Sequence, residues 1–310
     1  MKRNVILAWS SLQEFFFAPR SLYSLGIMRV IVSSALFGLY CWRQLEVQFF
    51  FTDKNGVILK AQSLELLPEV YRPLFRLFIW PDSLVPWIHG ILVLSLLGLM
   101  LGLGGRILTI IAWFLSLSFL QRNYFVAYGP DLIGTMWLFY LSWIRHDAYF
   151  SILNYFDKER VQRIKCDLLS SAGSRMIQIH LCIIYGYTGM QKLKGASWWD
   201  GTALWTVLGN QQMTVMDLTW TSHWPILIGI LGFMTLFFEV YFPVLVWYKP
   251  LRPWILTFGF LFHLGIAISM GIWSFGSIMV SSYFLFLNDN FRINILNMKH
   301  IRQYIPKFPF

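Results

Sequence analysis

Residues 224–247 read WPILIGILGFMTLFFEVYFPVLVW, a run in which Glu239 is the only charged side chain. A helix over this run is long enough to cross the hydrocarbon core of a bilayer, because that core is about 30 Å thick and each residue adds about 1.5 Å. The run therefore predicts a transmembrane helix. Its single acid lies where ionisable side chains are costly and usually face a cavity or another polar group.

Further apolar runs of similar character occur along the chain. They cover residues 24–42, 84–103, 107–120, 132–145, 176–191, 252–272 and 275–287. The composition agrees, since 57% of the 310 residues are hydrophobic and only 13% are charged, too few to give a soluble domain a polar surface. We expect an all-α, polytopic integral membrane bundle of about eight transmembrane helices. No repeat or linker divides it, so 1–310 is predicted to be one domain.

The lysines and arginines are distributed unevenly between the predicted loops. With the N-terminus in the cytoplasm, sixteen of them lie on cytoplasmic segments and eight on the opposite side. The positive-inside rule therefore predicts that both termini are cytoplasmic and that the residues around Lys192 face outward. The net charge of +10 is accounted for by this topology and by anionic headgroups, and no nucleic-acid partner is predicted.

Three segments outside the runs have a predicted place. We expect an interfacial helix over residues 4–18, an outer loop over 43–83, and a basic cytoplasmic loop over 146–175 that contains DKERVQRIK. The three cysteines stand far apart in the sequence, which favours neither a disulfide framework nor a metal site.

Three ionisable side chains fall near the middle of their predicted spans. Arg29, Glu239 and His263 lie about 14–16 Å from the inner surface when depth is counted along a helix from the nearest basic residue. An isolated carboxylate at this depth would take up a proton. We therefore expect Arg29 or His263 to offset the charge on Glu239, either as a polar clasp between helices or as the wall of a site.

Lys192 ends the fifth run, within GMQKLKGASWWDGTA at 189–203. A lysine at this position ordinarily extends its side chain to the headgroups. The alternative is a functional lysine covered by the turn formed by Trp198, Trp199, Asp200 and Gly201. Aromatic cover would exclude water, which lowers a lysine pKa and allows the amine to act as a general base.

Several segments resemble the HTTM (horizontally transferred transmembrane) domain, the membrane module of vitamin K-dependent gamma-carboxylases. The most specific is YGYTGMQKLKGASWWDGTAL at 185–204, which begins with Tyr185 and contains the Lys-Leu pair and the Trp-acid-Gly turn. The others are FEVYFPVLVW at 238–247, FLFHLGIAISMGIWSFGSIMVSSYFLFL at 260–287, and, more weakly, LGIMRVIVSS at 25–34. The resemblance covers most of the chain.

The resemblance implies a role for particular residues. In those carboxylases the lysine of the Lys-Leu pair deprotonates vitamin K hydroquinone, and the oxygenated product is the strong base that removes a glutamyl proton before carbon dioxide is captured. Lys192 would be that base, the turn after it its cover, and His263 part of the functional interior. The match fails at YGPDLIG (128–134), where Asp131 stands in place of the carboxylases' histidine, so carboxylation itself is less expected than the lysine chemistry.

The functional expectation follows from these residues. The chain would be a gamma-carboxylase-like protein of a bacterial cytoplasmic (inner) membrane, with a reduced quinone as cofactor, no metal, and an exported peptide or protein as substrate. The alternative is a non-enzymatic membrane accessory or maturation factor for an exported peptide or partner protein.

Overall fold

The computed structural model describes residues 2–66, 69–75 and 78–287, in which every regular element is a helix. The all-α prediction is thus confirmed for these residues. The eight predicted runs correspond to α2 (Leu22–Leu45), α6 (Val85–Met100), α7 (Gly105–Arg122), α8 (Gly129–Leu141), α11 (Leu168–Lys192), α14 (Pro225–Leu245), α15 (Arg252–Met270), and α16 (Trp273–Ser281) continued by η5 (Ser282–Phe286).

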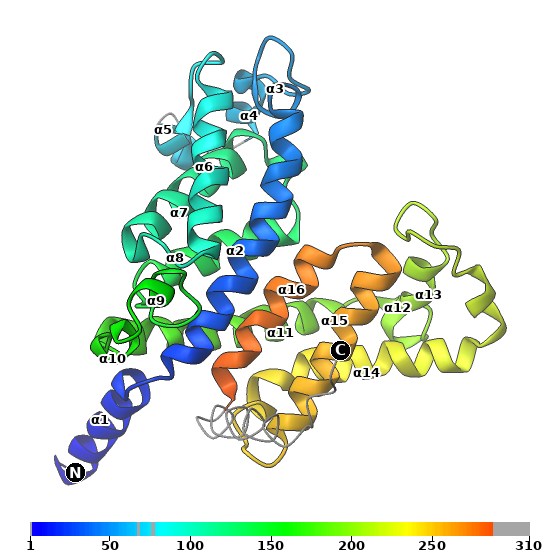
Figure 1. Ribbon diagram of the computed structural model, residues 1–310. Helices are drawn as coiled ribbons and strands as arrows, with labels where there is room; N and C mark the ends of the chain where they lie inside the picture. The colour runs from blue at the N-terminus through cyan, green and yellow to red at the C-terminus, as the bar shows by residue number, and fades with distance from the viewer. Residues whose placement is uncertain (1, 67–68, 76–77, 288–310) are drawn as a thin grey trace, which may run out of the picture.

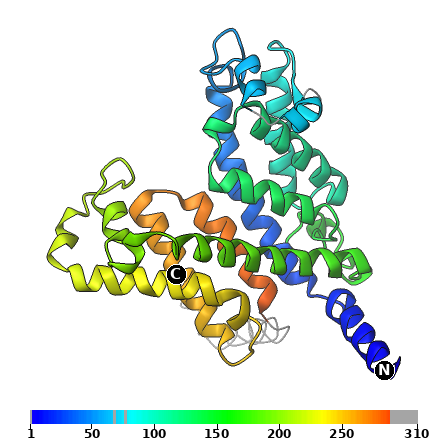
Figure 2. The same ribbon diagram turned by 180° about the vertical axis from the view of Figure 1, so that it is seen from behind.

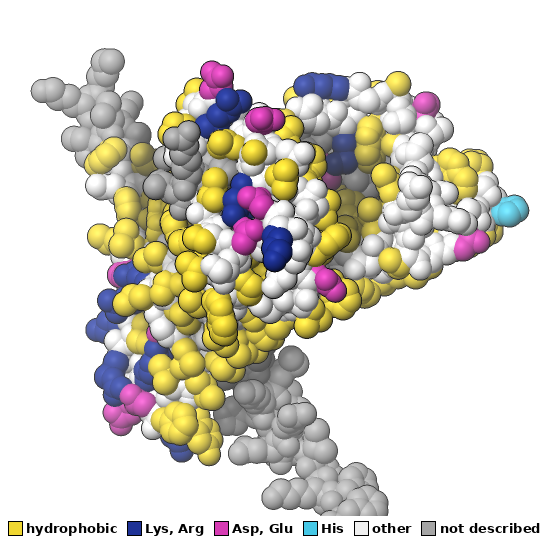
Figure 3. Space-filling view, turned by 90° about the horizontal axis from the view of Figure 1, so that it is seen from above, with side chains coloured by type: hydrophobic (Ala, Val, Ile, Leu, Met, Phe, Trp, Pro, Cys, Tyr) yellow, Lys and Arg dark blue, Asp and Glu magenta, His cyan; other side chains and the backbone are white. Residues whose placement is uncertain are grey.

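Three of these helices, α2, α14 and α15, are long and apolar enough to cross a membrane, and α6 and the α16–η5 segment are apolar but shorter. Large apolar side chains on these helices are exposed, as lipid-facing positions require: Trp42 is 68% exposed, Ile226 79% and Trp254 74%. Figure 3 shows hydrophobic side chains spread over one face of the molecule, with the charged ones gathered in separate patches. The chain is therefore associated with a membrane, while a count of eight crossings stays a prediction.

Helix α2 lies between two groups of helices (Figures 1 and 2). On one side it contacts α6 and α8, with α7 packed against both of these, and on the other it contacts α16 and η5. The second group continues through α15 and α14 to α11. Two short helices, α12 (Ala196–Trp199) and α13 (Ala203–Leu208), pack against α14. Lys192, Glu239 and His263 belong to the second group, whereas Arg29 lies on α2 and Asp131 on α8.

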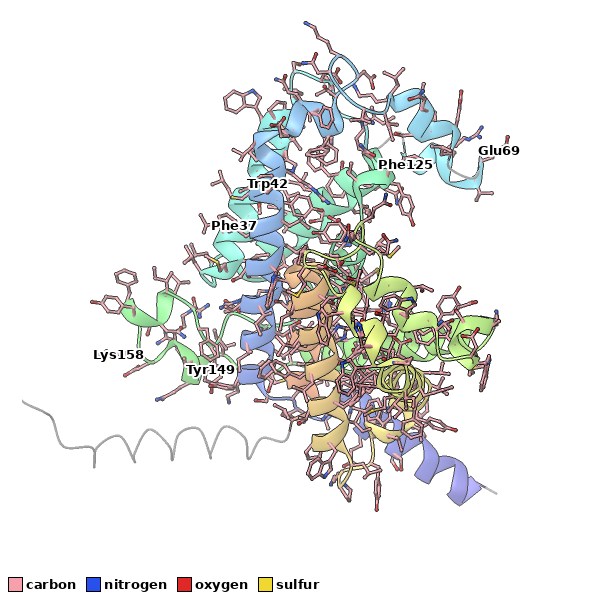
Figure 4. The ribbon with its side chains drawn as sticks, turned by 90° about the vertical axis from the view of Figure 1, so that its right-hand side faces the viewer. Phe37, Trp42, Glu69, Phe125, Tyr149 and Lys158 are labelled. Atoms are coloured by element: carbon pink, nitrogen blue, oxygen red, sulfur yellow. The ribbon has the colours of Figure 1, made fainter. Side chains whose placement is uncertain are left out.

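The predicted loops contain short helices. The outer segment holds α3 (Val47–Phe51), α4 (Lys60–Glu65) and α5 (Arg72–Phe75), and the basic segment holds α9 (Leu153–Phe156) and α10 (Arg160–Arg163). Figure 4 places Glu69 near one end of α2 and Lys158 near the other, so the two segments lie at opposite ends of the bundle. The predicted interfacial helix is α1 (Lys2–Phe17). The predicted cytoplasmic C-terminus lies outside the described residues.

Helix α11 begins eight residues before the predicted run, because polar residues start it. Asp167 is its N-cap and accepts a hydrogen bond from the Ser170 backbone N–H at 2.8 Å, together with ion pairs from Arg106 and Arg145. Burial raises the pKa of Asp167, but the hydrogen bonds from Ser170 and Arg106 outweigh it and lower the pKa to about 2. The carboxylate is therefore ionised and stabilises the helix N-terminus.

Helices α11 and α14 approach closely where α11 contains glycines and α14 contains a proline. A Cβ added at Gly189 would lie 2.8 Å from the backbone N of Val240 and 3.0 Å from the carbonyl carbon of Glu239, and one at Gly186 would lie 3.2 Å from Pro243. Pro243 has no N–H to donate to the carbonyl of Glu239, one turn earlier. Small residues allow such a contact between membrane helices, and it brings Glu239 beside the end of α11.

Replacing Gly189 with alanine is expected to loosen this crossing, because the new methyl group meets backbone atoms that cannot rotate away. Overpacking of this kind costs about 1–3 kcal/mol. The measurement is the thermal unfolding midpoint of the detergent-purified protein. Gly38→Ala on α2 is the matched control, since nothing lies within 4 Å of a Cβ there. Equal midpoints for the two variants would contradict the close-contact explanation.

Candidate functional site

Lys192 and Glu239 form an ion pair between α11 and α14. The Lys192 ammonium Nζ donates a hydrogen bond to Glu239 Oε2 at 2.5 Å, with 25% of the lysine side chain and 6% of the glutamate side chain exposed. Lys192 is the last residue of α11, where the helix dipole also favours a cation. The predicted charge offset for Glu239 therefore exists, but it is supplied by Lys192 and by neither Arg29 nor His263.

A second polar cluster lies deeper in the same group of helices. The Tyr185 hydroxyl of α11 is hydrogen-bonded to His263 Nε2 of α15 at 2.6 Å and to the Tyr283 hydroxyl of η5 at 2.5 Å. All three side chains are buried. Gly259, one turn before His263, leaves the space that the Tyr283 hydroxyl fills. The three groups form a continuous hydrogen-bonded chain through the interior.

The ion pair and this hydrogen-bonded chain are neighbours. Tyr185 precedes Lys192 by seven residues, so both lie on one face of α11 at about 10 Å along its axis. The ring of Tyr185 packs against Phe238 and Phe242, which flank Glu239 on α14. Five polar side chains from four elements thus share a mostly apolar interior.

A cavity of about 370 Å³ opens beside His263, between α15, α16 and α2. Its other walls are mostly apolar, among them Ile31, Phe260, Ala267 and Trp273. His263 Nδ1 is buried and has no hydrogen-bond partner among the described residues. A buried ring nitrogen without a partner is costly, so a group that bonds to it here would be favoured.

The cavity continues into a wider groove between α2 and α16. The groove has a volume of about 710 Å³ and shares Ile31, Trp273 and Ser277 with the cavity. It follows α2 from Val30 to Trp42, along one of the helices long enough to cross a membrane. The cavity beside His263 therefore adjoins a groove that follows α2 and α16 as far as Trp42 and Tyr128.

The turn after Lys192 covers it only in part. The Trp198 ring centroid lies 5.5 Å from the Lys192 ammonium, a cation–π contact. Trp199 is 60% exposed and donates its indole N–H to the carbonyl of Leu193. The predicted cover by Trp199, Asp200 and Gly201 is therefore wrong, and Trp198 alone provides it.

Asp200 and Gly201 shape the turn instead. Asp200 is exposed and accepts hydrogen bonds from the hydroxyl and the backbone N–H of Thr202, which lower the pKa of its carboxyl. Gly201 has φ 79° and its Cα lies close to Gly229 of α14. A residue with a side chain is disfavoured at this φ, so the glycine allows the chain to return to α14 and start α13.

Arg29 and Asp131 lie away from Lys192. Arg29 is buried and donates from Nη2 to the carbonyl of Phe150 at 2.7 Å, next to Gly102. Asp131, at the start of α8, forms a bidentate ion pair with Arg43 of α2 at 2.6 and 2.9 Å. The site that the structure brings together therefore contains Lys192, Glu239, Tyr185 and His263, and excludes these two.

Two partners were missed by sequence reasoning. Tyr283 lies in the apolar run 275–287, and nothing in the sequence distinguishes it from a lipid-facing residue of that run. Arg43 was counted as a loop charge, yet it lies inside the last turn of α2. Arg43 and Asp131 both lie at the predicted outer ends of their spans, and this shared position could have indicated that they pair.

Comparisons of the chain with protein-family models, with curated proteins and with solved structures found no match. In the described residues, no three side chains of the His, Cys, Asp or Glu types gather closely enough to hold a metal ion.

Proposed function

We propose that this chain is a gamma-carboxylase-like membrane protein that binds a reduced quinone beside His263 and uses the Lys192–Glu239 pair in proton transfer, acting on an exported peptide or protein. The observation that carries the proposal is the convergence of Lys192, Glu239, Tyr185, His263 and Tyr283 within one apolar helix group, in which His263 also lines a cavity. Buried ionisable groups in an apolar interior are costly and are therefore often found at functional sites.

The residues around the cavity fit a quinone-type ring. A volume of about 370 Å³ lies in the range of about 300–1,000 Å³ typical of small-molecule pockets. Its apolar walls suit a ring, and His263 Nδ1, which has no partner among the described residues, would hydrogen-bond one oxygen atom on it. A lipid-soluble tail would follow the groove along α2. When bound, a hydroquinone supplies an acidic hydroxyl and two reducing electrons.

The chain's own groups can then move a proton. The amine of Lys192 acts as a base only in its uncharged form, so a proton on it must first pass to a neighbouring group. Glu239 is the adjoining acceptor, at 2.5 Å. Within the deeper cluster, the Tyr185 hydroxyl can donate to His263 Nε2 while it accepts from Tyr283. This direction places a hydrogen on His263 Nδ1, which then donates to a ring oxygen.

A non-enzymatic accessory role is the second candidate, and one observation favours it. The Lys192–Glu239 pair lies where Gly189 brings the two helix backbones together, so it also serves as a clasp that fixes α11 against α14. A protein of this kind would keep the fold and an apolar pocket for a partner or lipid without using Lys192 as a base.

Binding of menadione, a tailless naphthoquinone, to the purified protein tests the cofactor. We expect saturable quenching of tryptophan fluorescence, because Trp273 lines the cavity. Affinity should fall at least tenfold in His263→Leu and in Ala267→Leu, which fills the cavity without removing a hydrogen bond. His223→Leu, at an exposed histidine, is the control. Absence of binding to the wild type, or equal affinity in all variants, would refute the cofactor assignment.

The base role is tested with Lys192→Ala. Oxygen consumption with reduced menadione should be lost in Lys192→Ala and kept in Lys194→Ala, while menadione binding is unchanged in both. If the wild-type protein binds menadione without consuming oxygen, the accessory role is the correct one. If the Lys192→Ala protein consumes oxygen at the wild-type rate, Lys192 is not the base.

A further inference from the structure

A second cavity, of about 440 Å³, lies at the opposite end of the second helix group from the Lys192 turn. It forms where the end of α1, the start of α2, the first turns of α11, the end of α14, the start of α15 and the end of η5 meet. It shares no lining residue with the cavity beside His263. Its ligand is therefore a separate question from the proposed quinone.

The charged side chains that line this cavity are all basic: Arg20, Arg175, Lys249 and Arg252. Among the described residues that line it, none is acidic. Arg175 donates to the carbonyl of Phe15 at 2.7 Å and to the amide oxygen of Gln178 at 2.7 Å. Within the described residues, neither Arg175 nor Lys249 forms an ion pair. Arg175 and Lys249 therefore bring positive charge to the cavity that no described carboxylate offsets, and such charge attracts an anion.

Two helix N-termini add to this positive potential. Ser21 is the N-cap of α2 and makes no side-chain capping hydrogen bond, and Arg252 begins α15. Both residues line the cavity. The first backbone N–H groups of a long helix have no partner within the helix and carry a partial positive charge. Phosphate groups bind at such ends.

Apolar and aromatic side chains stand beside the cations. The guanidinium of Arg175 lies over the Phe15 ring at 4.1 Å and near the Trp247 ring at 5.5 Å. Leu285 and Phe286 complete this wall. The cavity lies at the ends of α2, α14 and α15, which are long and apolar enough to cross a membrane, so the headgroup region would meet the hydrocarbon near it. An amphiphile with a phosphate group and acyl chains matches both surfaces, whereas a free phosphate matches only the cations.

We propose that this cavity binds the phosphate headgroup of an anionic phospholipid from the adjoining leaflet. Basic pockets between membrane helices on the cytoplasmic side commonly hold such headgroups, and this end of the bundle is the one predicted to be cytoplasmic. The lipid would join α1 to the ends of α2, α11 and α15, and so fix the N-terminal helix on the bundle.

The test uses the full-length protein in nanodiscs of phosphatidylcholine with increasing amounts of phosphatidylglycerol, followed by native mass spectrometry of the released protein. We expect one phosphatidylglycerol to be retained in preference to phosphatidylcholine. Lys249→Glu should weaken this retention at least tenfold. Lys165→Glu is the matched control, because Lys165 is exposed in the same predicted cytoplasmic region but does not line the cavity.

Two outcomes would overturn the proposal. One is equal retention of the two lipids, or equal weakening in Lys249→Glu and Lys165→Glu, which would reduce the effect to general surface charge. The other is displacement of phosphatidylglycerol by millimolar inorganic phosphate alone, which would identify a free phosphate site. Because Lys249 is exposed and forms no ion pair within the described residues, its substitution is expected to leave folding intact, and the unfolding midpoint in detergent checks this.

Discussion

Replacing Asp131 with asparagine is expected to lower the stability of the protein by about 3–5 kcal/mol, the cost of leaving one partner of a buried ion pair uncompensated. Arg43 and Asp131 have side-chain exposures of only 7% and 1%. Asp131 also accepts a hydrogen bond from the Tyr128 backbone N–H at 3.1 Å, which caps α8. The variant would leave the Arg43 guanidinium without its carboxylate in a site that water does not reach.

The measurement is the midpoint of unfolding in detergent, by heat or by sodium dodecyl sulfate. Glu159→Gln is the control, because it makes the same chemical change at an exposed carboxylate. Arg43→Met combined with Asp131→Leu should recover part of the loss, since an apolar pair has no desolvation cost. A variant at Asp131 that unfolds like the Glu159 variant would show that the pair contributes nothing.

The second large effect is expected at Lys192 and Glu239, with an asymmetry set by their burial. Lys192→Met leaves the Glu239 carboxylate, whose side chain is 6% exposed, without a partner, and should cost about 3 kcal/mol. Glu239→Gln should cost less, because the Lys192 side chain is 25% exposed and can turn toward the headgroups. The double variant should be less destabilised than the sum of the two, by about 1–3 kcal/mol.

The same unfolding measurement gives all three values. Lys194→Met is the control for removing a lysine from this turn, since Lys194 is exposed and donates only to Gln191. Additive effects in the double variant would mean that the two side chains do not interact in the folded protein.

Helix positions were largely predictable, because hydrophobic length is a one-dimensional property of the sequence. Each of the eight runs corresponds to a helix within a few residues. The exception is the start of α11, where Ser170, Ser171 and Ser174 are buried against protein and not against lipid. Hydropathy cannot distinguish a polar residue that faces water from one that packs against a neighbouring helix, so the run was predicted to start too late.

The partners within the site were less predictable. Counting residues from the ends of the spans gave the depth of Arg29, Glu239 and His263, but not the rotation of each helix or the order in which helices pack. In the structure Arg29 points to the carbonyl of Phe150 and Glu239 to Lys192. Depth gives only the position of a residue along the membrane normal. Helix rotation and the choice of neighbouring helix depend on contacts such as the one at Gly189.

The groove along α2 has a consequence for how any ligand of this protein is measured. A molecule that enters between α2 and α16 comes from hydrocarbon, and its local concentration is set by partition between lipid and water. Each methylene group adds about 0.8 kcal/mol to that partition. Two ligands with equal affinity inside the cavity would thus differ by orders of magnitude in apparent aqueous affinity if their tails differ in length. If ligand concentration is expressed as mole fraction in the bilayer, the two ligands would show the same affinity.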